Sequence, residues 1–266
     1  MKFMNCKISS IHYCPVKSIS FQSVDSREIK KNIGIIGDRI FAFAKDLDIN
    51  KVKLFEKSPE ERKGKWNKIL TLKNSPVLNK YNFLIKDDDL TLTFKDKEVL
   101  TIDINHLSER EKLANKIIEL ESSLKEPIFL MKNKEFPFFD TSVSNKVDFT
   151  NSVSLLNVQS INDFQNKIDK EIEKSRFRGN IYVDGIKPWE ERNWIGKIIK
   201  INNVLFKVKK NIPRCVAINL KPKTEDDSLN LLQSLKKTYN HFDMGIYLTC
   251  LEDGKIEIGN KIEINK

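Results

Sequence analysis

The sequence has few of the features that mark membrane, metal-cluster or secreted proteins. No stretch approaches the roughly 18 consecutive apolar residues of a membrane-spanning helix, and the start, MKFMNCKISS, has no signal-peptide core. The four cysteines form no CxxC pair, which argues against a zinc ribbon, a thioredoxin motif or an iron–sulfur ligand set and favours buried thiols. The three histidines are too scattered for a metal cluster. We therefore expect a soluble, cytoplasmic protein without a membrane anchor.

Arginine is scarce as well. Only eight of the 47 basic residues are Arg, although the chain of 266 residues carries a net charge of +10. The lysines are spread along the whole sequence among Asp and Glu, and there is no Arg-rich run and no RNP-like aromatic strand. This distribution argues against nucleic acid as a partner. It leaves open a local basic pocket for a phosphorylated small molecule.

Apolar residues are nevertheless frequent enough for a core: they make up 39% of the chain and include 16 Phe. The first hundred residues contain seven short runs rich in Ile, Val, Phe and Thr, separated by turn residues, which predict a sheet-rich barrel or sandwich. These runs are residues 6–13, 19–30, 39–45, 69–74, 80–86, 90–95 and 98–104.

The later part of the chain mixes helices with strands. Apolar residues at helical spacing predict helices that open at Ser108-x-x-Glu111 and Ser160-x-x-Asp163, and another around Leu232. The polar stretch 57–66 is expected to be a loop. Further strands are expected near 155–158, 180–183, 195–201, 204–209, 215–220, 245–251 and 255–264. The fold class is thus α+β, mostly β, with a boundary near residue 125 that separates residues 1–125 from residues 126–266.

Two segments of the first half carry groups suited to binding an anion. Lys17 and Ser18 follow Pro15 on a turn, where an ammonium, a hydroxyl and backbone amides suit a phosphate. Asp38 can hold Arg39 so that its guanidinium offers a bidentate fork to a phosphate or a pterin-like ring. The alternatives are a solvated loop for the first segment and a hairpin turn with a surface ion pair for the second.

Two segments of the second half add cations and a thiol. In Arg176-Phe177-Arg178-Gly179-Asn180, an extended chain would place both arginines on one side and Phe177 in the core. Cys215 follows a Pro turn at the start of an expected strand, and Arg214 beside it favours the thiolate, which is a soft ligand for molybdenum, copper(I) or zinc. The alternatives are two solvated arginines and a small buried thiol.

Taken together and in this order, the motifs resemble the MOSC-domain proteins with an N-terminal MOSC β-barrel domain, which include the amidoxime reducing components. The resemblance rests on PVKS (15–18), GDR (37–39), RFRGN (176–180), PWEERNWIG (188–196), PRC (213–215), MGIY (244–247) and GKIEIGNKI (254–262). It implies an N-terminal β-barrel-like domain over residues 1–125 and a MOSC β-barrel domain with flanking helices over residues 126–266. The chain departs from the family at Cys14, where Tyr is usual, and at Pro213, where amidoxime reducers commonly have Ser.

The resemblance also implies a molybdenum cofactor, Mo-molybdopterin. Cys215 would be the metal ligand and the catalytic residue, and Arg214 would flank the metal. The phosphate and the pterin would be held by residues that match the family motifs, namely Lys17, Ser18, Arg39, Arg178 and Asn180. His241 and Asp243 are candidates for a general acid, although surface residues are the simpler interpretation.

The implied activity is the two-electron reduction of N-hydroxylated compounds such as amidoximes and hydroxylamines. The chain has no flavin fingerprint, no haem attachment motif and no iron–sulfur cysteine set, so a separate electron-donor protein is expected. An alternative from another class is a carrier of the cofactor or of sulfur, in which Cys215 holds a persulfide and catalyses no reduction.

Overall fold

A closed barrel of seven strands forms the largest sheet in the described part of the chain. The computed structural model describes residues 2–19, 21–124, 127–139 and 152–264. Around the barrel the strands follow the order β11, β10, β14, β13, β12, β16, β1, and β1 returns to β11 to close the sheet. The strands are β1 (Lys2–Tyr13), β10 (Val153–Asn157), β11 (Ile181–Asp184), β12 (Ile198–Ile201), β13 (Val204–Pro213), β14 (Asp243–Cys250) and β16 (Lys261–Ile264).

Closure depends on the long first strand. β1 pairs antiparallel with β16 at one edge and with β11 at the other, where Ile8 lies opposite Val183. β10 and β11 are parallel, so a crossover must join them, and α3 (Val158–Ile168) provides it. The barrel interior is filled by Ile, Val and Leu side chains together with Trp194 and Phe206. The expected mostly β α+β fold is confirmed.

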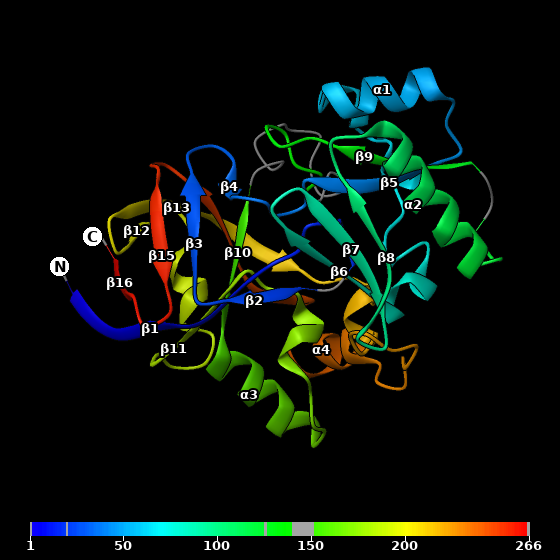
Figure 1. Ribbon diagram of the computed structural model, residues 1–266. Helices are drawn as coiled ribbons and strands as arrows, with labels where there is room; N and C mark the ends of the chain where they lie inside the picture. Colours follow the sequence, from blue (N-terminus) through cyan, green and yellow to red (C-terminus); the bar gives the residue numbers. More distant parts are fainter. Residues whose placement is uncertain (1, 20, 125–126, 140–151, 265–266) are drawn as a thin grey trace.

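The other sheets belong largely to the first half of the chain (Figure 1). β5 (Phe41–Lys45) pairs with β9 (Ile128–Lys132), and β6 (Tyr81–Lys86), β7 (Asp89–Phe94) and β8 (Lys97–Asp103) form a meander. α2 (Leu107–Leu120) packs Leu113 and Ile117 into the same core, and α1 (Ile49–Lys57) packs Val52 and Phe55 into a neighbouring cluster. The remaining elements are β2 (Gln22–Val24), β3 (Ser26–Lys30), β4 (Gly34–Ile35), β15 (Gly254–Glu257) and α4 (Leu231–Tyr239).

Several expected elements differ from those observed. α2 begins after His106 and α3 after Asn157, so neither Ser108 nor Ser160 is the N-cap. The run 69–74 is not a strand: Ile69 forms a single bridge with Ala44, and the chain then turns. Residues 215–220, expected as a strand, form the 3-10 helix Val216–Asn219. α1 has no counterpart among the expected elements.

Strand pairing crosses the expected domain boundary. β1 belongs to the barrel of the second half, and β9 pairs with β5 of the first half. Residues 125 and 126, at the boundary itself, lie outside the described residues. The division at residue 125 therefore stays a prediction. Within the described part of the chain, no helix combines the length and the apolar character needed to cross a membrane.

Candidate functional site

One cavity of about 210 Å³ collects most of the residues that the sequence singled out. It lies between the barrel and the first half of the chain, since its walls come from both. Six of the seven expected site residues line it, namely Lys17, Ser18, Arg39, Arg178, Arg214 and Cys215.

Cys215 lies in this cavity as an exposed thiol, whereas the other three cysteines are buried. β13 ends at Pro213, and the Arg214 amide still donates to the Phe242 carbonyl, 2.9 Å away, so the chain leaves the barrel edge in a fixed direction. Cys215 has extended backbone angles and precedes the 3-10 helix Val216–Asn219. The thiol is therefore presented at the end of a strand, as expected, although no second strand follows it.

Backbone carbonyls hold the Arg214 side chain in the wall of the cavity. Its Nε donates to the Met244 carbonyl over 2.8 Å, its Nη2 donates to the same oxygen, and its Nη1 donates to the Phe177 carbonyl over 2.7 Å. Burial lowers the pKa of the Arg214 guanidinium, which nevertheless stays charged at neutral pH. The MGIY and RFRGN motifs thus meet at this side chain.

Arg178 comes from a 3-10 turn rather than from an extended strand. Its backbone is left-handed, with φ of 50°, so Arg178 points to the cavity while Arg176 is buried elsewhere against Glu173. The expectation that the two arginines share one side is wrong, and the placement of Phe177 in the core is confirmed. The Arg178 guanidinium donates to the Ser18 carbonyl over 3.1 Å and to Asn79 Oδ1 over 2.7 Å.

Neither Arg178 nor Arg214 has a carboxylate partner among the described residues. The arginine ion pairs found there involve Arg39, Arg110, Arg176 and Arg192. The buried Nε of Arg178 also lacks a hydrogen-bond partner in the described part of the chain. Burial lowers the pKa of Arg178. Two guanidinium charges thus adjoin the cavity with only neutral acceptors around them, which favours an anionic ligand.

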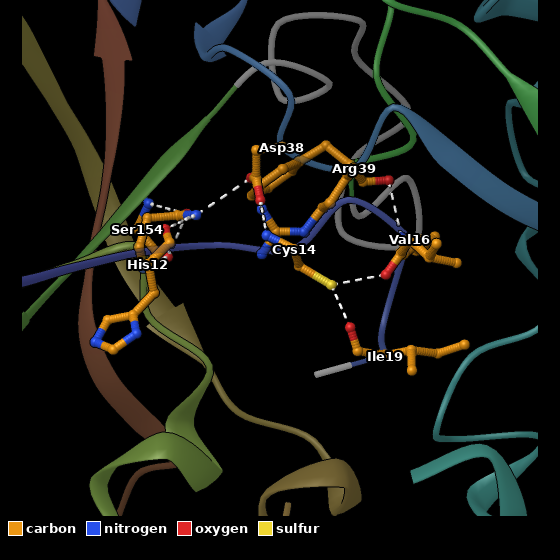
Figure 2. Close-up of polar contacts among 10 residues, drawn as sticks. His12, Cys14, Val16, Ile19, Asp38, Arg39 and Ser154 are labelled. Carbon is orange, nitrogen blue, oxygen red and sulfur yellow. Dashed lines mark hydrogen bonds and ion pairs between the residues drawn. The ribbon is translucent and has the colours of Figure 1, made fainter. Parts of the chain in front are cut away.

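Arg39 is fixed by Asp38, as the sequence indicated. Figure 2 shows Asp38 between the backbone of Cys14 and the Arg39 side chain, and its carboxylate accepts from the Cys14 amide over 2.7 Å and pairs with Arg39 Nη1. Burial raises the pKa of Asp38. The Arg39 guanidinium lies near two aromatic rings, 4.7 Å from the centroid of Phe139 and 5.4 Å from that of Phe21.

Lys17 and Ser18 project from a turn that Pro15 begins after β1 ends. Cys14 stands where the family usually has Tyr. Its buried thiol donates to the Val16 carbonyl over 2.7 Å and so stabilises this turn (Figure 2). Lys17 is mostly buried, and its Nζ donates to the Phe139 carbonyl over 3.0 Å. The segment is therefore an ordered wall of the cavity rather than a solvated loop.

Asn180 is the expected site residue that does not line the cavity. It is fully buried, and its Nδ2 donates to Asp38 Oδ2 while its Oδ1 accepts from Ser154 Oγ over 2.8 Å. Its side chain does not reach the cavity surface in this structure, so its contact with a cofactor stays a prediction. Asn180 instead lies behind Asp38, from where it orients the carboxylate that holds Arg39.

The remaining walls include residues that the sequence did not single out, namely Phe21, Thr71, Leu72, Lys73 and Phe139, together with Tyr247 of the MGIY motif. Residues 71–73 belong to the run expected as a strand. Asn74 turns the chain there, because its Oδ1 accepts from the Thr71 amide over 2.8 Å. His241 and Asp243 do not line the cavity; Arg192 lies 3.1 Å from His241 Nε2 and 3.4 Å from Asp243 Oδ2.

The donor set fits an anionic group that carries a soft metal. Among the described residues that line the cavity there is no carboxylate, whereas one exposed thiol lies among lysine and arginine cations. A thiolate is the soft ligand that molybdenum accepts, and guanidinium and ammonium groups match a phosphate. The described residues contain no group of three His, Cys, Asp or Glu side chains that could hold a metal ion.

Comparisons with known proteins agree with the motif resemblance. The family model of the MOSC domain matches residues 142–263. Mitochondrial amidoxime reducing component 2 of Bos taurus is 25% identical over 161 residues, which cover 56% of this chain and 46% of that protein. The chain thus spans about half the length of this curated relative.

Two solved structures also show similarity. The match to the YUAD protein from Bacillus subtilis covers 99% of this chain and 97% of the YUAD chain, with a TM-score of 0.45 and 11% sequence identity. The match to YiiM from Geobacillus stearothermophilus covers 43% of this chain and 54% of the YiiM chain, with a TM-score of 0.34 and 16% sequence identity.

Proposed function

We propose that the cavity of this protein binds Mo-molybdopterin, and that the protein reduces N-hydroxylated compounds with electrons from a separate donor protein. The match of residues 142–263 to the MOSC domain supports the choice of cofactor. The observation that carries the proposal is the exposed Cys215 thiol in a cavity lined by cations and free of carboxylates among the described residues. The similarity to an amidoxime reducing component supports the choice of reaction.

The proposal assigns a role to each of the predicted site residues. Cys215 would ligate the metal, and the Arg214 guanidinium beside it would place a positive charge next to the ligating sulfur. Lys17 and Ser18 from one turn, with Arg39 and Arg178 from two others, would hold the phosphate and the pterin by charge-assisted hydrogen bonds. Asn180 would act through Asp38 on Arg39.

When bound, the cofactor supplies a two-electron redox couple, which is the chemistry that the protein side chains lack. The overall reaction takes up two electrons and two protons, breaks the N–O bond and releases water and the amine or amidine. The exposed position of Cys215 leaves the cavity open to water, from which protons arrive. Phe21, Leu72 and Tyr247 give the cavity apolar surface against which an aryl or alkyl amidoxime can pack.

The test measures molybdenum per chain in purified protein by mass spectrometry and then the reduction of benzamidoxime by an artificial reductant. We expect molybdenum and turnover in the wild type, and loss of both in Cys215→Ala with folding retained. Val216→Ala is the matched control, because Val216 is the neighbouring exposed residue and does not line the cavity. Bound molybdenum without turnover would instead establish a cofactor carrier, and a wild type that takes up no molybdenum when expressed with the cofactor overturns the proposal.

A further inference from the structure

Asn79 is a buried residue of the first half that contacts Arg178 in the cavity wall but does not itself line the cavity. It lies on the 3-10 helix Pro76–Lys80 and is 1% exposed. Its Nδ2 donates to the carbonyl of Lys221 over 2.6 Å and to the carbonyl of Thr224 over 2.7 Å. Its Oδ1 accepts from Arg178 Nη2 over 2.7 Å.

These contacts fix the orientation of the amide. Two carbonyl oxygens on one side require the NH₂ group, which has two hydrogens to donate, so Oδ1 must face the guanidinium. Reversing the amide would place its NH₂ against Arg178 and its oxygen against two carbonyls, and would lose all three hydrogen bonds. Asn79 therefore holds Arg178 in one position, and no carboxylate is needed to do so.

The same amide reaches the segment that carries the thiol. Lys221 and Thr224 follow the 3-10 helix after Cys215. Leu220 of this segment is buried in the core of the first half, and Ala217 packs against it. Asn79 thus joins the Arg178 turn and the Cys215 segment to one point on the first half of the chain.

We infer that Asn79 is a positioning residue for anion binding: its side chain holds the Arg178 guanidinium in the wall of the cavity that Cys215 also lines. This inference rests on the proposed function. It assigns the recognition of the phosphate to a hydrogen bond across the two halves as well as to the residues that line the cavity. Its ligand chemistry is that of a phosphomonoester, for which inorganic phosphate is a simple probe.

The experiment measures the Kd of inorganic phosphate by calorimetry on cofactor-free protein, as a double-mutant cycle of Asn79→Ala and Arg178→Ala. Because one charge-assisted hydrogen bond orients the guanidinium, we expect Asn79→Ala to weaken phosphate binding by about tenfold. In the Arg178→Ala background the same change should have less than a twofold effect, because there is no guanidinium left to orient. A purely structural role for Asn79 would give the same loss in both backgrounds.

Asn79→Asp is the second variant. It keeps an acceptor for Arg178 but adds a negative charge, so we expect a loss of phosphate affinity at least as large as in Asn79→Ala. Glu225→Gln is the matched control, because it breaks the 3.0 Å Lys80–Glu225 ion pair between the same two segments without touching Arg178; its Kd should change less than twofold. An unchanged Kd in a folded Asn79→Ala protein, an equal loss in both backgrounds, or failure of both Asn79 variants to fold overturns the inference. Failure of the wild type to bind phosphate counts instead against the proposed function.

Discussion

Gly245, in the MGIY segment of β14, is a position where a single added methyl group should destabilise the protein strongly. Its φ is +81°, which costs a residue with a side chain about 1–2 kcal/mol. A Cβ built there would lie 2.5 Å from the Leu155 carbonyl oxygen and 3.0 Å from Leu156 Cγ. Leu155 and Ile246 are paired in the β10–β14 ladder, so the backbone cannot yield without loss of strand pairing. Overpacking of this kind costs about 1–3 kcal/mol more. We expect Gly245→Ala to destabilise the protein by about 2–5 kcal/mol.

Gly259 provides the matched control for this prediction. Its φ is +86°, but a Cβ there would meet nothing within 4 Å, so Gly259→Ala should cost only the backbone term of about 1–2 kcal/mol. Urea denaturation followed by circular dichroism gives both free energies of unfolding. The added Cβ would also lie 3.4 Å from Arg214 Nη2, so Gly245→Ala should weaken phosphate binding while Gly259→Ala leaves it unchanged. Equal destabilisation by the two substitutions would refute the argument from the Leu155 clash.

Three further predictions concern single side chains. Burial opposes ionisation of Glu173, but hydrogen bonds from Arg176 and Lys221 prevail and lower its pKa to about 2. Its contribution to stability is therefore full above pH 4.5 and is lost as the pH falls towards 2, and unfolding of Glu173→Gln measured across this range should show a flatter dependence. Arg62 is fully buried and donates to the carbonyls of Phe55, Glu56 and Phe136. Because Arg62→Met removes these hydrogen bonds, it should lower the free energy of unfolding by about 3 kcal/mol. A loss below about 1 kcal/mol in urea denaturation would contradict this prediction. Cys215→Ala should change the same free energy by less than about 0.5 kcal/mol, because the thiol is exposed; a larger change would show that the thiol has a structural role.

The sequence predicted the strands better than the helix starts. Short runs rich in Ile, Val, Phe and Thr between turn residues marked β6, β7 and β8, whose apolar side chains pack into the core. α1 was not predicted, although Asp48 is its N-cap and accepts hydrogen bonds from the amides of Asn50 and Lys51. The helix has only nine residues and buries only Val52 and Phe55. Such a short apolar stripe does not stand out among surrounding lysines.

The motifs predicted which residues gather at the cavity but not how they are held. Six of the seven expected residues line it because the resemblance covers the turns that form its walls. Asn180 lies beneath the cavity, and its burial depends on Ser154 and Asp38, which are far from it in sequence. Asn79 had no signal at all, because its partners Arg178, Lys221 and Thr224 are brought to it only by the docking of the two halves.

The dependence of the cavity on both halves has a physical consequence for Arg178. Its acceptors, the Ser18 carbonyl and Asn79 Oδ1, both belong to the first half, whereas its own backbone belongs to the turn before β11. Without the first half the guanidinium would be free to turn into water, and the second half alone would offer a mobile cation instead of an oriented one. Because Leu220, close to Cys215, also packs in the core of the first half, the thiol would lose its fixed position at the same time. Under the proposed function, anion binding and metal ligation would therefore be coupled through the contacts between the two halves, and a change that loosens these contacts should reduce both together.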